Sequence, residues 1–169
     1  GTVLHVSRST DSGVTWTEIL TVTNGLNPAL AVTSAGTAGC LYQQLVGTRW
    51  ETHLRRRTNT GTTWTDLILS NTPDNNPAPL FQPYLGDYCD LMSVGNNFYG
   101  VFSASNIPDS ANFPQGVKYQ RNANFTTHQL RNLANTGNVN TSIDPFFFAV
   151  EQRNILDRCL IMPWRCKVP

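Results

Sequence analysis

An eight-residue segment that occurs twice, 48 residues apart, constrains the fold of this chain more than any other feature. The copies are Ser9-Thr10-Asp11-Ser12-Gly13-Val14-Thr15-Trp16 and Arg57-Thr58-Asn59-Thr60-Gly61-Thr62-Thr63-Trp64. Each has an Asp or Asn, a Gly and a Trp at the same steps, followed by a short alternating run. An Asx side chain bonds its own downstream backbone, Gly supplies a positive φ and Trp fills the space beneath a turn. Both copies therefore predict the turn of a β-hairpin.

Alternation of apolar and polar residues between turn-forming residues predicts an all-β chain with about twelve strands. We find no stretch with a helical period. The predicted strands cover residues 2–7, 16–22, 29–33, 39–46, 51–57, 64–69, 87–94, 98–104, 116–121, 128–133, 145–150 and 156–162.

The repeat resembles the Asp-box of bacterial neuraminidases, whose pattern is S-x-D-x-G-x-x-W. The first copy matches in full, and the second has Arg57 for Ser and Asn59 for Asp. Residues 83–88, followed by 97–103, resemble the inner half of a blade in bacterial sialidase-like proteins. Together these resemblances cover most of the chain and imply a β-propeller. In that family the Asp-box joins the third and fourth strands of a blade, remote from the ligand face.

The blade pattern implies a single domain over residues 1–169 with about three blade equivalents. These are an outer half-blade at 1–22, whole blades at 27–70 and 80–133, and an inner half-blade at 143–164. A closed ring needs more blades than this. Either the chain is part of a longer propeller, or its inner half-blade pairs with the outer half-blade of a second copy to give six blades, the number that sialidases use.

Composition narrows the choice of partners. Hydrophobic residues make up 40% of the chain, enough to bury a core, and twelve basic against eleven acidic residues give a net charge of +1. This balance gives no electrostatic reason to expect nucleic acid or an anionic membrane. Charged residues are only 14% of the chain, against roughly 25% in typical soluble domains. We expect a strand-rich, exported protein, either extracellular or periplasmic.

The four cysteines do not indicate a metal site, because they form no CxxC pair and have no Cys/His spacing typical of zinc. Cys40 and Cys89 lie in apolar, strand-like runs and are expected to be packed thiols. Cys159 and Cys166 could close a short loop as a disulfide. No cofactor is predicted.

The propeller resemblance places a ligand face at the loops that lead into the inner strands, here residues 25–28, 85–88 and 142–145. This puts Asn27, Asp87 and Asp144 around one channel mouth, with Tyr84 and Tyr88 beside them. Polar acceptors beside aromatic faces suit a sugar, whose hydroxyls need directional partners. The competing interpretation is that each Asx residue only caps a turn.

Sialidase chemistry in this family needs three arginines around the substrate carboxylate, a Tyr–Glu nucleophile and an Asp for proton transfer. The family's Arg-Ile-Pro motif is absent, and no arginine lies at the entry to a predicted inner strand. We therefore assign no catalytic residue. Asp87 and Tyr88 would be acid or base and assisting phenol only in a hydrolase. The histidines His5, His53 and His128 lie in separate predicted strands and suggest no joint site.

Three functions remain open. The favoured one is a catalytically silent, lectin-like propeller that binds a glycan or a protein surface through its channel mouth. The second is an exo-acting glycoside hydrolase of which this chain is a fragment. The third is a structural or assembly role in which open half-blades dock partners by strand pairing.

Overall fold

The structure, a computed structural model, describes residues 1–151, and this part of the chain is all β, as predicted. One 3-10 turn, Ser110–Asn112, interrupts it. The strands are β1 (Val3–Arg8), β2 (Thr17–Thr23), β3 (Gly25–Val32), β4 (Ala38–Val46), β5 (Arg49–Arg57), β6 (Thr65–Pro73), β7 (Asp90–Val94), β8 (Asn97–Ser105), β9 (Asn122–Asn124), β10 (Gln129–Arg131), β11 (Asn138–Val139) and β12 (Ile143–Val150).

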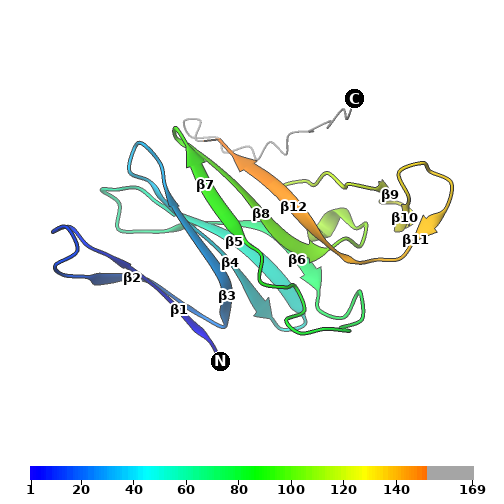
Figure 1. Cartoon of the computed structure of the whole chain (residues 1–169), viewed down its shortest axis with the longest axis horizontal. Coiled ribbons are helices and arrows are strands. Elements are labelled where there is room, and N and C mark those ends of the chain that lie inside the picture. Colours follow the sequence, from blue (N-terminus) through cyan, green and yellow to red (C-terminus); the bar gives the residue numbers. More distant parts are fainter. Residues whose placement is uncertain (152–169) are drawn as a thin grey trace.

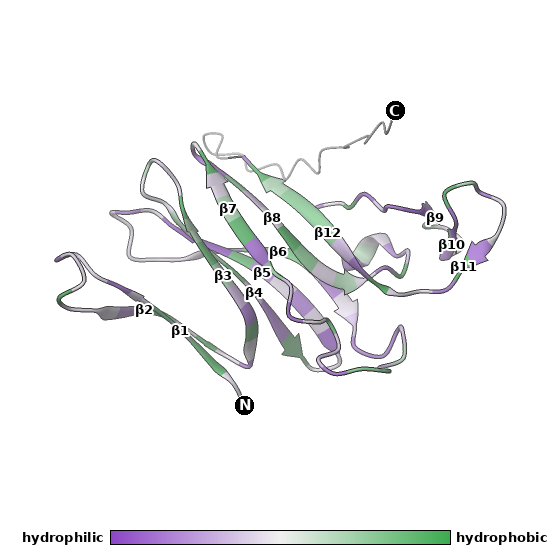
Figure 2. Cartoon of the chain, viewed as in Figure 1, coloured by the Kyte–Doolittle hydropathy of each residue, from purple (hydrophilic) through white to green (hydrophobic). Residues whose placement is uncertain are grey.

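The strands form four antiparallel sheets (Figure 1). We call β1–β2 the first sheet, β3–β4–β5–β6 the second sheet, β12–β8–β7 the third sheet and β11–β10–β9 the small sheet. The second sheet lies between the first and the third, with one buried cluster on each of its faces. The small sheet is polar, whereas β12 is largely apolar (Figure 2). The first three sheets therefore stand in series, face against face.

Both copies of the repeat form hairpin turns, as predicted. The first joins β1 to β2 and the second joins β5 to β6. In the first turn Asp11 accepts a hydrogen bond from the Thr15 backbone N–H at 2.9 Å, and Ser9 Oγ donates to Asp11 at 2.8 Å. Gly13 has a φ of 90°, the left-handed region that glycine enters without steric cost. The polar groups of Ser9 and Asp11 therefore make hydrogen bonds within the turn and stabilise it.

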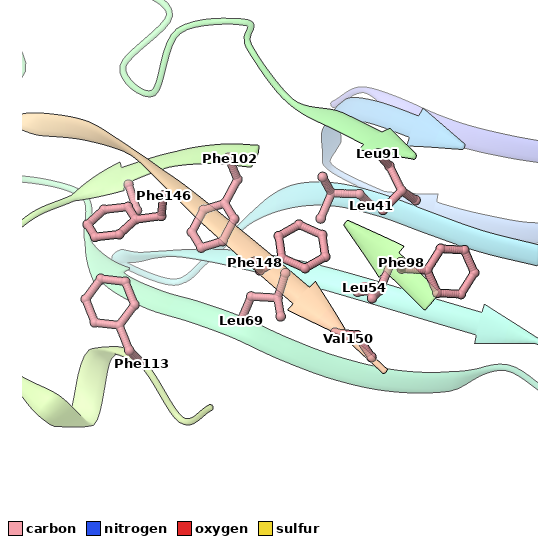
Figure 3. Close-up of a cluster of buried hydrophobic side chains, with 11 residues drawn as sticks. Leu41, Leu54, Leu69, Leu91, Phe98, Phe102, Phe113, Phe146, Phe148 and Val150 are labelled. Atoms are coloured by element: carbon pink, nitrogen blue, oxygen red, sulfur yellow. The ribbon is translucent and has the colours of Figure 1, made fainter. Parts of the chain in front are cut away.

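The main core lies between the second and third sheets (Figure 3). The strands β4, β5 and β6 of the second sheet each contribute a buried leucine to this core, and β8 and β12 of the third sheet contribute mainly phenylalanines. The sheets approach closely at Gly39, where an added Cβ would lie 2.6 Å from the Phe98 ring. The buried residues are Leu41, Leu54, Leu69, Leu91, Phe98, Phe102, Ala104, Phe113, Phe146, Phe148 and Val150.

A second core joins the first sheet to the opposite face of the second. Val6, Leu20 and Val22 of the first sheet bury against Cys40 and Tyr42 of β4. The prediction that Cys40 is a packed thiol is confirmed, since this residue is a buried free thiol. Cys89 is a free thiol too, half-buried against the main core, in line with its prediction.

Trp64, the tryptophan of the second repeat, also fastens the first sheet to the second. Its indole N–H donates to the Ile19 carbonyl at 2.7 Å, and its ring packs against the second core. The first sheet is thus held to the second, and the second to the third, by packed apolar faces. Trp64 adds a hydrogen bond between the first and second sheets.

The pairing of β12 differs from the predicted blade boundaries. Residues 80–133 were predicted to form one blade and 143–164 a separate inner half-blade, but β12 pairs with β8 along its whole length. Phe146 lies opposite Phe102, and Val150 opposite Phe98. This register buries Phe146, Phe148 and Val150 in the main core. Periodicity identified β12 as a strand but could not identify its neighbour.

The strand predicted over 116–121 is wrong, because these residues are irregular. Their alternation has another cause: Val117 and Tyr119 pack on the main core from a loop. Tyr119 donates its hydroxyl to the Ile107 carbonyl at 2.6 Å, and its ring meets Phe146 edge-on. The predicted strand at 156–162, the Cys159–Cys166 pair and the end of the 143–164 segment lie outside the described residues.

Candidate binding groove

A groove of about 420 Å³ opens where the long loop between β6 and β7 meets the start of β12. Most of its walls are apolar. The polar groups come from Thr141, Ser142, Tyr84 and the backbone of Gly86. We refer to it as the entry groove; its residues are Pro77, Ala78, Leu80, Phe81, Tyr84, Leu85, Gly86, Thr141, Ser142 and Ile143.

Asn27 positions one wall of the entry groove without lining it. It was predicted to lie in a loop, but it sits in an irregularity within β3, between Leu26 and Ala29, with a φ of 53°. Its side-chain amide donates to Gln43 Oε1 and to the Gly86 carbonyl, both at 2.8 Å. The side-chain N–H groups of Asn27 are therefore committed to the protein rather than to a ligand.

Tyr84 lines the entry groove directly. Its hydroxyl donates to the Pro77 carbonyl at 2.8 Å, which joins the two ends of the loop that forms this wall. Burial, with a smaller effect of the Asp74 charge, raises the pKa of Tyr84 above its ordinary value of 10. Tyr84 therefore stays a neutral phenol at physiological pH and offers the groove a ring edge.

Asp87 and Tyr88 are not among the residues that line the groove. They follow Gly86, which has a φ of 70°, and both side chains are exposed, Tyr88 by 80%. Asp87 is not seen to hydrogen-bond to any other described residue. Of the five predicted ligand residues, these two are the ones whose side chains are free to meet a ligand.

Asp144 lies behind the groove wall, in β12 opposite Ala104. Its carboxylate accepts hydrogen bonds from Ser142 Oγ at 2.7 Å and from Asn106 Nδ2 at 2.8 Å. Arg121 Nε lies 3.4 Å from the same carboxylate. With its side chain 14% exposed, Asp144 holds Ser142 and the start of β12 in place.

The three predicted entry segments thus meet at one groove, but their residues have different structural roles there. Tyr84 lines it, and Asn27 and Asp144 support its walls through Gly86 and Ser142. Asp87 and Tyr88 do not line it but directly follow its wall residue Gly86 with exposed side chains. The hydrogen bonds of Asn27 and Asp144 join separate segments of the chain, so their roles match neither turn-capping nor direct ligand contact. An uncharged cleft of this size, with the exposed carboxylate of Asp87 next in the chain to its wall residue Gly86, can hold a small neutral ligand or a short chain.

No arginine lies at the entry to a predicted inner strand in the sequence, but the fold brings Arg121 from a loop to Asp144 at the start of β12, where the two side chains pair at 3.4 Å. The position of Arg121 could not be predicted because it comes from a loop, not from the predicted strand at 116–121. Among residues 1–151 no arginine lines the entry groove.

Sequence reasoning missed Leu80 and Phe81, two exposed apolar residues on the groove wall. The signal is an apolar pair between Pro79 and Pro83, in a segment with no strand alternation to bury it. Phe81 is 82% exposed, which is unusual for a phenylalanine. These residues extend the apolar surface of the groove.

The repeat itself is longer than the eight residues that revealed it. His5 and His53 are 48 residues apart, and so are Glu18 and Asp66. His5 Nδ1 lies 2.6 Å from Glu18, and His53 Nδ1 lies 3.1 Å from Asp66. A search for further matches at the 48-residue spacing, outside the turn itself, would have found these two histidine–carboxylate pairs.

No group of three or more His, Cys, Asp or Glu side chains within residues 1–151 is arranged to hold a metal ion. Within the same residues, no helix has the length and apolar character needed to span a bilayer. Comparisons with protein-family models, with curated proteins and with solved structures found no match.

Proposed function

We propose that this chain is an exported binding module of the Asp-box, sialidase-like propeller type, and that it holds a glycan at the entry groove. In this proposal the first sheet is an outer half-blade and the second a whole blade. The third sheet, with β12 as its third strand, belongs to another blade. The low proportion of charged residues supports the extracellular or periplasmic location.

The observation that carries the proposal is the convergence of three chain entries on one groove. The entries to β3, β7 and β12 come from distant parts of the sequence, yet Asn27, Gly86 and Ser142 meet around it through hydrogen bonds and shared walls. Ligand sites are concave, mostly apolar and oriented by a few polar groups. The entry groove has this character.

The chemistry of the groove favours a neutral sugar. The exposed rings of Tyr88 and Phe81 present flat apolar faces to sugar C–H groups, while Asp87 accepts hydrogen bonds from hydroxyls. Thr141 and Ser142 add hydroxyl groups in the wall. No positive side chain of residues 1–151 lines the groove to grip a carboxylate, so a neutral glycan fits it better than a sialic acid.

A second candidate ligand is a protein surface, which the exposed pair Leu80 and Phe81 favours. Large exposed apolar side chains beside a groove are typical of protein contacts. A partner of this kind would depend on Leu80 and Phe81 more than on Asp87.

Binding to an array of neutral and sialylated glycans tests the proposal. We expect binding to neutral glycans that is weakened at least tenfold by Asp87→Asn and by Tyr88→Ala. Val14→Ala, which shortens an equally exposed side chain in the first repeat turn, is the matched control and should bind normally. No glycan binding at all, or equal binding by Asp87→Asn and the control, would refute the glycan proposal.

The hydrolase alternative needs its own measurement. It would use Asp87 as acid or base with Tyr88 assisting. Release of the fluorophore from a fluorogenic sialoside, abolished by Asp87→Asn, would replace the binding proposal with this one. The binding proposal expects no turnover.

A further inference from the structure

The third sheet has an outward face that carries several exposed apolar side chains, while Ala149 on the same face is buried. Side chains alternate across a strand, so residues next to the buried Phe98, Phe102, Phe146 and Phe148 point away from the main core. Tyr99 and Phe147 stack on each other there, with ring centroids 6.4 Å apart. The exposed apolar residues of this outward face are Met92 (55%), Val94 (60%), Val101 (37%) and Phe147 (39%).

The first sheet has an open face at the other end of the series. Val6, Leu20 and Val22 point into the second core, so His5, Glu18 and Thr21 occupy the outward face. His5 and Glu18 are paired within this face at 2.6 Å, with their side chains 54% and 51% exposed.

In the second sheet the equivalent histidine is buried, and the equivalent carboxylate is less exposed than Glu18. His53 and Asp66, the repeat equivalents of His5 and Glu18, have side chains that are 6% and 35% exposed. His53 stacks on Tyr42, whose ring belongs to the core that the first sheet completes. The repeat therefore carries a histidine–carboxylate pair on the face that receives the preceding sheet. In the first sheet, no sheet formed by residues 1–151 packs on this face.

We propose that the chain assembles head to tail with a second copy, the outward face of the third sheet in one copy packing on the outward face of the first sheet in the next. Within the chain, the first sheet covers the second and the second covers the third. If the first sheet of a second copy packs on the third sheet of the first copy, the same sequence of stacked sheets continues from one copy to the next. A heterologous contact of this kind produces a ring if its rotation closes and a filament if it does not.

The charges on the two faces allow this contact. On the third sheet's outward face the strand alternation places one charged residue, Asp90, at the edge strand β7. On the first sheet, Glu18 already has His5 as its partner. Packing these faces together would bury the apolar side chains of the third sheet. It would also bury the His5–Glu18 pair, whose desolvation cost is offset in part because each group keeps its partner. The contact does not involve the entry groove, so it does not depend on the proposed ligand.

Light-scattering mass measurements on the full chain, from micromolar to millimolar concentration, test the assembly. We expect masses at multiples of 18.7 kDa. Met92→Glu and Thr21→Arg each place a charge on one of the two faces and should each return the mass to 18.7 kDa. Leu133→Glu, at an exposed site on neither face, should assemble as the unchanged chain does. Circular dichroism melts confirm that the variants are folded.

Mixing the two variants gives the decisive result. Met92→Glu keeps an intact first sheet and Thr21→Arg keeps an intact third sheet, so together they should form a complex of twice 18.7 kDa and no larger. A chain that stays at 18.7 kDa at every concentration overturns the proposal. So do an assembly unaffected by either variant, which uses another surface, and a mixture that fails to pair.

Discussion

The side-chain amide of Asn27 donates to the Gly86 carbonyl at 2.8 Å and so joins the beginning of β3 to the loop before β7. The same amide donates to Oε1 of Gln43, a side chain that is fully buried in β4. One residue thus links two neighbouring strands of the second sheet to the wall of the entry groove. Asn suits this position because its φ of 53° lies in the left-handed region, which Asn tolerates better than most residues.

Replacing Asn27 should therefore cost stability in two separable ways. Asn27→Gly keeps the positive φ accessible but leaves the buried Gln43 acceptor without this donor, so we expect the free energy of unfolding to fall by about 1–3 kcal/mol. Asn27→Ala should cost about 1 kcal/mol more because of its Cβ in the left-handed region. Urea unfolding measures both. Equal stability of Asn27→Gly and the unchanged chain would show that the amide contacts do not stabilise the fold.

Asp11 should make the stability of the first turn sensitive to acid. Hydrogen bonds from the Thr15 hydroxyl, the Thr15 backbone N–H and the Ser9 hydroxyl lower the pKa of Asp11 from 3.8 to about 2. Because the folded pKa is the lower one, the stabilisation is present above the unfolded value of 3.8 and is lost as pH falls through about 2. An NMR titration of the Asp11 carboxyl group should have its midpoint near the lower value.

The Asp11→Asn variant checks the same linkage through the melting temperature. It should melt below the unchanged chain at neutral pH, and the gap should narrow as the pH falls from 3.8 towards 2. Asp87→Asn, at an exposed site with no hydrogen bond to another described residue, is the control. A gap that stays constant with pH would mean that the carboxylate charge does not stabilise the turn.

The two repeat tryptophans should differ in importance. Trp64→Phe removes the N–H that donates to the Ile19 carbonyl between sheets, and we expect a loss of about 1 kcal/mol. In the first repeat, Trp16 is 65% exposed and donates to Gly13 within its own turn, so Trp16→Phe should cost less, about 0.5 kcal/mol. Chemical denaturation gives both values. A larger loss for Trp16→Phe would contradict this ranking.

Gly39 should not tolerate a side chain. Its missing Cβ leaves room for the Phe98 ring, which would otherwise lie 2.6 Å away, so Gly39→Ala should destabilise the chain by about 1–3 kcal/mol. If the ring is the cause, the same substitution should cost less in a Phe98→Leu background. A double-mutant cycle of unfolding free energies measures the coupling. If the losses in unfolding free energy from the two substitutions simply add, the Phe98 ring is not the cause of the Gly39→Ala loss.

Cys40 and Cys89 should react slowly in the folded protein. Burial raises the pKa of each thiol from 9.0 to about 11, so little thiolate is present at pH 8. Iodoacetamide should therefore label these two cysteines only after unfolding, as followed by peptide mass spectrometry. Rapid labelling of Cys40 under native conditions would show that the second core opens readily.

The sequence alone predicted much of the fold because the relevant signals are local. The repeat predicted both hairpin turns, and alternation located β1, β2, β4, β5 and β6 to within a few residues. A turn depends on the φ of Gly13 and on side chains a few residues apart, all of which lie within one short segment.

The candidate site was predicted only in part. Tyr84 lines the entry groove, but the expected loop around Asn27 is an irregularity inside β3, and Asp144 is occupied by Asn106 and Arg121. Whether a polar residue faces a ligand or a neighbouring strand depends on segments far away in the chain. Residue types and spacing indicate where such a residue lies along the chain, not what fills the space beside it.

Sequence by itself determined that this chain is all β, that its two repeat turns close hairpins and that Cys40 is buried. Tertiary structure alone decided that β12 pairs with β8, that Val117 and Tyr119 reach the core from a loop, and that residues 77–86 meet 141–143 in a groove. The physical reason is range: turn geometry and strand alternation depend on neighbours along the chain. Strand partners and groove walls depend on which apolar faces bury the most surface together, and that choice is made across the whole molecule.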